Sequence, residues 1–308
     1  MRVVVTGGAG FIGTNVCRAL VAGGHDAVAV DDLSTGSKDN LADLPAVSLV
    51  EGTILDPDVL DDAFAGADAV VHLAARGSVP RSIEDPRATH AANTTGTLEV
   101  LEAARRAGSP HVVVASSSSV YGASPRLPRV EDDVLLPVSP YAVSKVATEQ
   151  YALSFQQVFD LPVLAFRFFN VFGPHQPAGH AYAAVVPVFV DAALAGRPLP
   201  FHGDGTQTRD FTYVETVAAV VVDAVERRVT DGLPVNLAFG TRVSLLELAD
   251  LLEHVLGQPL ERAFGEPRPG DVRDSQADQT RLRVLFPDVE PVGLEAGLRA
   301  TVDWFRRS

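Results

Sequence analysis

The chain has 308 residues, 46% hydrophobic and 21% charged, which is typical of a globular protein and excludes collagens, coiled-coil rods and disordered chains. Its formal net charge of −14 makes the surface a poor match for a nucleic-acid backbone, so we expect no nucleic-acid partner. The single cysteine, Cys17, excludes an internal disulfide, and no Cys/His cluster has the spacing of a zinc site. The start of the chain lacks the features of a signal peptide, and no run approaches ~18 apolar residues. We therefore expect a cytoplasmic protein without a membrane segment.

Short β-branched runs alternate with helix-like segments through the first half of the chain. Continuous apolar strands that alternate with helices are typical of a parallel sheet with helices on both faces. We therefore expect an α/β fold, a doubly wound parallel sheet of the Rossmann type, with strands at residues 2–6, 27–31, 47–51, 69–73, 111–116 and 162–168. Asp56-Pro57 and Ser139-Pro140 predict helix starts, because each places a capping side chain before a proline at the first helical position.

Proline and glycine become frequent after residue 170, between shorter helices and strands. Within this half, Ser244 to Glu247 forms a capping box, which predicts another helix start. We expect two domains, the sheet domain at residues 1–170 and a smaller α/β domain at residues 171–308. The pattern leaves open whether later elements return to the first sheet.

A glycine-rich turn follows the first expected strand and opens a helix, in the order Val3-Val4-Val5-Thr6-Gly7-Gly8-Ala9-Gly10-Phe11-Ile12-Gly13. Backbone N–H groups and the positive end of a helix bind a pyrophosphate, and glycine lets the chain approach it closely. Asp31 ends the next expected strand, where a carboxylate accepts the ribose hydroxyl protons of NAD and repels a 2′-phosphate. The pattern favours an NAD site; the alternative is a tight turn with a surface aspartate.

Tyr141 and Lys145 lie one turn apart on the helix that begins at Ser139-Pro140. A tyrosine titrates near ~10, so its use as a base near neutral pH requires a pKa lowered by roughly 3 units. A nearby ammonium and a positive nicotinamide ring both favour the phenolate. The serine run at residues 116–119 ends the fifth expected strand, where parallel sheets bind ligands. Tyr-x-x-x-Lys by itself more often marks a surface, but combined with the glycine turn and the serines it predicts a proton-transfer site.

These segments resemble the extended short-chain dehydrogenases/reductases of the nucleotide-sugar epimerase group, over essentially the whole chain. The shared stretches are residues 6–13, 31–34, 72–75, 93–97, 116–122, 139–145, 167–174, 203–205 and 209–211. Within that group the chain is especially similar to UDP-N-acetylglucosamine 4-epimerases, through residues 77–82, 181–187 and 270–278. The resemblance implies an NAD-dependent isomerase that inverts C4 of a UDP-hexose through a transient 4-keto intermediate.

The resemblance also assigns roles to individual residues. It implies the catalytic set Ser117, Tyr141 and Lys145. It implies cofactor contacts at Gly7, Gly10, Phe11, Ile12, Gly13, Asp31, Asp32, Thr53, Ile54, Leu73, Ala74, Ala75, Asn93, Tyr141, Lys145 and Phe169. It implies substrate contacts at Gly77, Ser78, Ser117, Ser118, Tyr141, Asn170, Arg209, Arg268, Asp271 and Ser275. Among these, Asn170 and the two arginines are expected at the diphosphate, because arginine forms bidentate hydrogen bonds with phosphate oxygens. Asp271 is expected at the uridine ribose.

Two features set this chain apart from parts of the group. Family members usually hold the adenine with an acidic residue followed by isoleucine, whereas this chain has Thr53-Ile54, a neutral and weaker acceptor. The departure bears on the strength of NAD retention rather than on the identity of the cofactor. Related enzymes that dehydrate or decarboxylate the 4-keto sugar carry carboxylates where this chain has Ser118 and Ser119. Their absence implies that the ketone is reduced again.

Substrate choice is expected to depend on Ser275, which occupies the position that gates the space beside the sugar in the resembling epimerases. A small residue there admits an N-acetyl group, so we expect interconversion of UDP-GlcNAc and UDP-GalNAc, with UDP-Glc and UDP-Gal as further substrates. The nearest rival is UDP-glucuronate 4-epimerase, because Arg81 or the serine run is available to a C6 carboxylate. A dehydratase or decarboxylase and a non-catalytic NAD-binding scaffold are further alternatives. The joint presence of Ser117 and Tyr141 with Lys145 argues against the scaffold.

Residues 85–105 and 139–159 form helices with more apolar residues than one sheet face needs. In the resembling family these helices pair with their copies in a four-helix interface. We therefore expect a homodimer; burial of both helices inside one chain is the competing explanation.

Overall fold

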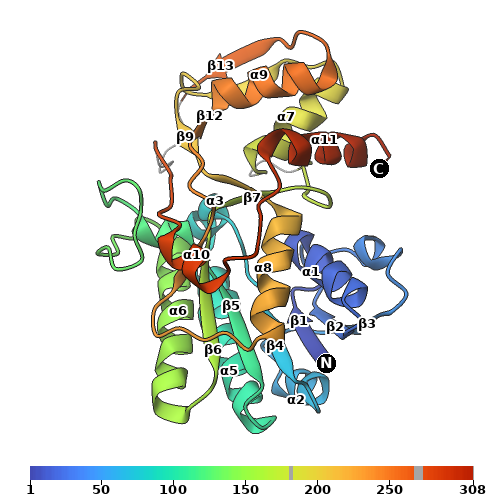
Figure 1. Ribbon diagram of the computed structural model, residues 1–308, viewed down its shortest axis with the longest axis vertical. Helices are drawn as coiled ribbons and strands as arrows, with labels where there is room; N and C mark the ends of the chain where they lie inside the picture. Colours follow the sequence, from blue (N-terminus) through green and yellow to red (C-terminus); the bar gives the residue numbers. More distant parts are fainter. Residues whose placement is uncertain (180–182, 267–272, 308) are drawn as a thin grey trace.

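The computed structural model describes residues 1–179, 183–266 and 273–307. Its centre is a seven-stranded sheet (Figure 1) in the order β11-β6-β5-β4-β1-β2-β3, with all neighbouring strands parallel. The strands are β1 (Arg2–Thr6), β2 (Asp26–Asp31), β3 (Val47–Glu51), β4 (Ala69–His72), β5 (His111–Ser117), β6 (Val163–Phe168) and β11 (Val235–Leu237). The six expected strands are confirmed to within one residue at each end, and the doubly wound α/β class is confirmed with them.

Helices cover both faces of this sheet. One layer contains α1 (Phe11–Ala22), α8 (Val214–Glu226) and α10 (Thr280–Leu285), and the other contains α2 (Pro57–Phe64), α5 (Gly96–Arg106) and α6 (Pro140–Phe159). Successive residues of β1 alternate between the two cores: Val3 and Val5 pack in the first layer and Val4 in the second. Because both faces are buried there, the central strands β1, β4, β5 and β6 have largely continuous apolar sequences rather than alternating ones.

Both predicted helix starts are confirmed. Asp56 caps α2, its Oδ1 accepting a hydrogen bond from the backbone N–H of Asp58 at 3.0 Å. Ser139 caps α6, its Oγ accepting from the N–H of Ala142 at 3.1 Å. The cap places Tyr141 in the first turn of α6, at the carboxyl edge of the sheet.

Short helical segments complete the first half of the chain. They are η1 (Lys38–Leu41), α3 (Val79–Glu84), α4 (Pro86–His90), the π-helical turn η2 (Ala91–Thr95) and η3 (Ser118–Tyr121). Within the described ranges, none of the helices combines the length and the apolar character needed to cross a bilayer.

The second half of the chain builds a separate group of elements beyond the carboxyl edge of the sheet (Figure 1). Its strands pair as β7 (Asn170–Phe172) with β10 (Phe211–Tyr213), β8 (Leu199–His202) with β13 (Arg262–Gly265), and β9 (Thr208–Arg209) with β12 (Val243–Ser244). Its helices α7 (Val185–Leu194), α9 (Leu245–Leu256) and α11 (Leu294–Phe305) enclose a third core. The predicted capping box of Ser244 and Glu247 opens α9.

Elements of the second half also return to the first. β11 pairs with β6, with Val235 opposite Phe166, and α8 packs beside α1. The strand escaped prediction because it has only 3 residues and a polar centre, Asn236, which is fully buried. The carboxyl edge of the sheet thus lies between the two groups of elements, where doubly wound folds bind ligands.

Candidate active site

The glycine-rich turn joins β1 to α1 at this edge. Gly7 has a φ of +73°, and a Cβ there would lie 2.8 Å from the backbone nitrogen of Ala74. A Cβ at Gly13 would lie 2.1 Å from the carbonyl oxygen of Gly7. Any side chain at these two positions would force the turn open, so its shape requires both glycines. A Cβ at Gly10 would meet only the Gly7 carbonyl oxygen, at 3.2 Å, among the non-neighbouring described atoms, which leaves room beside α1.

The first turn of α1 has no side-chain cap. Its leading N–H groups, from Phe11 to Gly13, have no intrahelical acceptors because they open the helix, and the helix dipole adds a partial positive charge there. Such a helix start, reached through a turn in which Gly10 has no side chain, fits the pyrophosphate of a dinucleotide.

Asp31 ends β2 and is 8% exposed. Its Oδ2 accepts a hydrogen bond from the N–H of Ala9 at 3.0 Å, and its Oδ1 from the N–H of Leu33 at 2.9 Å. Burial raises the pKa of this carboxyl, and the two N–H donors partly offset the rise. Each oxygen keeps a lone pair for a ribose hydroxyl. The predicted cofactor residues at this end line one cavity of about 300 Å³ that contains Gly7, Asp31, Asp32, Thr53, Ile54, Leu73, Ala74 and Ala75.

Ser117, Tyr141 and Lys145 meet at the end of β5. The hydroxyl of Ser117 lies close enough to the phenol of Tyr141 to lower its pKa. Ser117 Oγ also accepts from the N–H of Ser119 at 3.1 Å, which holds the hydroxyl in place. Lys145 Nζ donates to the carbonyl oxygen of Ala115 at 2.8 Å. The three residues line a second cavity, of about 310 Å³, with Gly7, Gly10, Phe11, Ile12, Gly13 and Phe169.

Burial shifts the pKa of both ionisable groups in this cavity. It raises the pKa of Tyr141 above its usual value, and the Ser117 hydroxyl lowers that pKa only in part. Burial also lowers the pKa of Lys145 to about 8. In the protein without ligands, desolvation therefore disfavours the charged form of each group. The positive nicotinamide ring expected from the sequence would favour the phenolate of Tyr141.

A third cavity, of about 380 Å³, lies between β7, β8 and α7. Asn170 and Arg209, both predicted at the diphosphate, line it together with His202 and Gln207. Arg209 Nη1 donates to the carbonyl oxygens of Thr208 at 2.9 Å and Arg273 at 3.2 Å. The guanidinium is thus tied to two segments of the second half of the chain.

The three cavities share walls. The Asp31 cavity and the Tyr141 cavity have Gly7, Leu73 and Ala75 in common. The Tyr141 cavity and the Arg209 cavity have Phe169, Val171 and Gln176 in common. The three cavities therefore lie next to one another, in the order Asp31, Tyr141 with Lys145, and Arg209. A ligand in the Asp31 cavity and a ligand in the Arg209 cavity would therefore both reach the Tyr141 cavity between them.

Other predicted residues lie away from these walls. Asn93 donates to Ser144 Oγ at 2.9 Å and accepts from the N–H of Arg76 at 2.7 Å, so its amide bonds to protein groups. Ser78 caps α3, accepting from the N–H of Arg81 at 3.2 Å, with Gly77 just before it. None of these three residues lines a cavity described above, and the same holds for Ser118, which opens η3, and Ser275. Arg268 and Asp271 lie outside the described residues.

Gln176 is a site residue that the sequence did not reveal. Its Nε2 donates to the carbonyl oxygen of Val171 at 3.1 Å, which fixes the amide. Its Oε1 is buried and has no hydrogen-bond partner among the described residues, although the side chain lines both the Tyr141 and the Arg209 cavities. A glutamine in a proline- and glycine-rich loop carries no pattern that distinguishes it from a solvated one.

The model of the NAD dependent epimerase/dehydratase family matches residues 3–238. The chain belongs to this family. It is 39% identical, over 99% of both chains, to a UDP-glucose 4-epimerase of Mycolicibacterium smegmatis. Its fold superposes with a TM-score of 0.93, at 35% identity and 99% and 98% coverage, on a UDP-N-acetylglucosamine 4-epimerase of Methanobrevibacter ruminantium solved with UDP-N-acetylmuramic acid. It superposes with a TM-score of 0.91, at 34% identity and 99% coverage of both chains, on a Thermus thermophilus UDP-glucose 4-epimerase solved with NAD.

The resemblance noted in the sequence is confirmed by these matches. Like other members of the NAD-dependent epimerase/dehydratase family, this chain is an enzyme that uses NAD, and it is an isomerase of the UDP-sugar 4-epimerase type. The glycine turn, the uncapped start of α1 and the Asp31 cavity are consistent with that cofactor.

Proposed function

We propose that the enzyme interconverts UDP-GlcNAc and UDP-GalNAc by inversion at C4, and accepts UDP-Glc and UDP-Gal as well. The observation that carries the reaction type is the placement of Tyr141 and Ser117, together with Lys145, in the wall of one cavity. A phenol and a hydroxyl at that point suit proton transfer with a sugar hydroxyl. The Arg209 cavity beyond them suits the nucleotide end.

In this mechanism Tyr141 accepts the proton of the sugar 4-hydroxyl, directly or through Ser117, and returns it after the sugar has presented its other face. NAD, when bound, supplies hydride transfer at C4 and a positive charge near the phenol. Lys145 keeps an ammonium beside Tyr141 while the pH stays below its pKa of about 8. The proton taken from the substrate goes back to it, so Ser117 and Tyr141 end each cycle unchanged.

The residues that follow Ser117 favour epimerisation over elimination. Ser118 and Ser119 stand where the dehydratases and decarboxylases that resemble this chain place carboxylates. A serine hydroxyl is neither the acid nor the base that loss of water or carbon dioxide requires at neutral pH. Re-reduction is then the path left to a 4-keto sugar held here.

Two observations support the acetamido sugar as substrate. The Methanobrevibacter ruminantium relative is a UDP-N-acetylglucosamine 4-epimerase. Ser275, the predicted gate, has a small side chain, and its N–H donates to the carbonyl oxygen of Thr208 at 3.2 Å, next to Arg209. Ser275 lines none of the three cavities of the ligand-free protein, so we infer from its small side chain and its place beside Arg209 that it leaves room for the acetamido group.

The substrate test is incubation of the purified, NAD-loaded enzyme with UDP-GlcNAc, UDP-Glc and UDP-GlcA separately, with chromatographic separation of the products. Epimerisation of UDP-GlcNAc is the expected result. Ser275→Tyr should abolish that reaction and spare UDP-Glc, because an aromatic ring would fill the space for the acetamido group. Turnover of UDP-GlcA alone would contradict the substrate proposal.

The uronate rival also has an observation in its favour. The hydroxyl of Ser119 is buried and has no partner among the described residues, and it lies two residues after Ser117, although Ser119 lines none of the three cavities. Ser119→Ala separates the two cases. It should leave UDP-GlcNAc turnover within about twofold, whereas an enzyme for UDP-GlcA should lose affinity for its substrate, since a hydrogen bond to a charged group contributes about 1.5–3 kcal/mol.

We further propose that the enzyme is a homodimer that pairs through α6. This helix exposes Val143 (54%), Val158 (65%) and Phe159 (41%) along its length. A helix that pairs with its copy needs apolar side chains on its outer surface, and these three residues supply them. Size-exclusion chromatography with light scattering should give twice the chain mass, and Val158→Asp should halve it. A wild-type monomer at micromolar concentration would contradict the proposal.

A further inference from the structure

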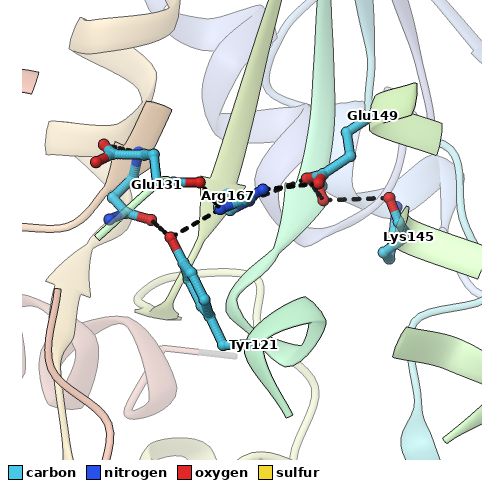
Figure 2. A network of polar contacts seen from close by, with 7 residues as sticks. Tyr121, Glu131, Lys145, Glu149 and Arg167 are labelled. Carbon is cyan, nitrogen blue, oxygen red and sulfur yellow. Dashed lines mark hydrogen bonds and ion pairs between the residues drawn. The ribbon is translucent and has the colours of Figure 1, made fainter. Parts of the chain in front are cut away.

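A buried ion pair joins α6 to β6 beside the catalytic residues (Figure 2). Arg167 on β6 and Glu149 on α6 have side chains 3% and 0% exposed, and Arg167 Nη2 lies 2.8 Å from Glu149 Oε1. A second bond joins Arg167 Nε to Glu149 Oε2 at 3.0 Å. Burying two charges costs free energy that their attraction recovers only in part, so such a pair is weak evidence for stabilisation. Its surroundings point to a geometric role.

The carboxylate of the pair binds the end of β5. Glu149 lies one turn after Lys145, and its Oε2 accepts from Ser116 Oγ at 2.9 Å. Ser116 Oγ also lies 3.3 Å from the carbonyl oxygen of Lys145. Because Ser116 directly precedes Ser117, the carboxylate holds the strand end that carries the catalytic hydroxyl against the turn that carries the lysine.

The guanidinium of the pair reaches the other way, toward the second half of the chain. Arg167 Nη1 donates to Tyr121 Oη at 3.0 Å and to the carbonyl oxygen of Glu131 at 2.9 Å. Tyr121 in turn donates to Asn236 Oδ1 at 2.6 Å, and burial raises the pKa of this phenol to about 12, so it stays neutral. Asn236 belongs to β11 and donates to the carbonyl oxygens of Arg129 and Asp278. Each of the three guanidinium nitrogens of Arg167 thereby donates to an acceptor within the protein.

We propose that Glu149 and Arg167 are positioning residues that hold Lys145 and Ser117 at their working separation. The inference rests on the proposed function, since it assumes that these two groups serve proton transfer with Tyr141. Neither member of the pair lines any of the three cavities, so neither is expected to touch a ligand. Loss of the pair therefore lowers kcat and leaves KM for the UDP-sugar, because the walls around Arg209 are built from other elements.

The decisive variant is Glu149→Leu with Arg167→Met, since a buried ion pair replaced by apolar residues of similar volume often leaves a fold as stable or more stable. The expected result is an enzyme that folds and retains NAD. Its kcat should be about 10²-fold lower, because small displacements of catalytic groups slow the reaction to that extent. Its KM for the UDP-sugar should stay within about threefold of the wild-type value. Glu149→Asp is the second variant. It keeps the charge but is one methylene shorter, and should lower kcat in the same way.

The matched control is Asp61→Asn, which removes an exposed ion pair between α2 and α5. In this pair Arg106 Nη2 lies 2.7 Å from Asp61 Oδ1. Its loss should leave kcat unchanged. A folded double variant with wild-type kcat would overturn the positioning role. If the double variant does not fold, a folded Glu149→Asp enzyme with wild-type kcat overturns it equally. A wild-type protein that epimerises no UDP-hexose contradicts the proposed function instead, so the two failures are distinct.

Discussion

The Nζ of Lys145 donates a hydrogen bond to the carbonyl oxygen of Ala115 across 2.8 Å, and this bond ties α6 to β5. The strand continues to Ser117, whose hydroxyl lies beside Tyr141 on the same helix. The three catalytic candidates therefore lie along one strand–helix contact. Loss of the bond between Lys145 and Ala115 should affect chemistry more than ligand binding.

Tyr141→Phe should lower turnover by about 10²- to 10⁴-fold, the usual contribution of a general acid–base group, because phenylalanine keeps the ring and loses the proton carrier. NAD retention, measured by absorbance of the released nucleotide, should be unchanged. Tyr151→Phe is the matched control, a 38% exposed tyrosine on the same helix. Unchanged turnover in the Tyr141 variant would refute its role.

Lys145 should make the free energy of unfolding depend on pH. Burial lowers its pKa from 10.5 to about 8, so the unfolded chain binds more protons between these values and stability rises with pH in that window. Below about pH 8 the folded protein bears the full cost of the buried ammonium, up to about 3 kcal/mol for a shift of this size. Urea unfolding of wild type and Lys145→Met at pH 7 and pH 10 measures it. The variant should have the larger free energy of unfolding at pH 7, and the difference from wild type should disappear at pH 10. A difference that stays the same at both pH values would show that the lysine is not desolvated as described.

Asp31 should control the choice of dinucleotide. Its carboxylate is held by the N–H groups of Ala9 and Leu33 and repels a 2′-phosphate. Calorimetric titration of the NAD-free protein should show that NAD binds far more tightly than NADP. Asp31→Asn should reduce the ratio of the two dissociation constants by about tenfold or more, because a charge interaction of about 1.4 kcal/mol is lost. Asp26→Asn, at the exposed start of the same strand, is the control. A preference for NADP in wild type would contradict this assignment.

Gln176 should have opposite effects on stability and on binding. Its Oε1 is a buried acceptor without a partner among the described residues, and leaving such a group unpaired costs about 1–3 kcal/mol. Gln176→Met should therefore raise the Tm of the ligand-free protein. It should also weaken binding of whichever ligand, NAD or the UDP-sugar, donates a hydrogen bond to Oε1 of Gln176. Gln157→Met, on the exposed face of α6, should do neither. A lower Tm with unaltered binding would assign Gln176 a purely structural role.

Strands β1, β2, β4 and β5 could be predicted because they are buried on both faces, so local sequence and final environment agree. Val3, Val4 and Val5 all read as core, and all are fully buried. The glycine turn and the pair of Tyr141 and Lys145 could be predicted for a similar reason. A turn that excludes a Cβ at Gly7 and a helix that places positions four apart on one face are properties of short segments.

The remaining features depend on residues far apart in the chain. Asn236 is a polar residue in a strand of only 3 residues, so the local sequence does not predict a buried strand there. Its burial is explained by its hydrogen bonds with Tyr121 and Arg129, which are distant in the chain. The pairing of Glu149 with Arg167 likewise needs α6 and β6 to pack before either charge finds its partner.

Sequence alone thus determined six of the seven strands of the sheet, the glycine turn and the spacing of Tyr141 and Lys145, because short-range geometry and burial pattern specify them. Tertiary structure decided the raised pKa of Tyr141, the unpaired acceptor of Gln176 and the buried network behind Lys145, because desolvation and hydrogen-bond partners depend on which distant segments meet.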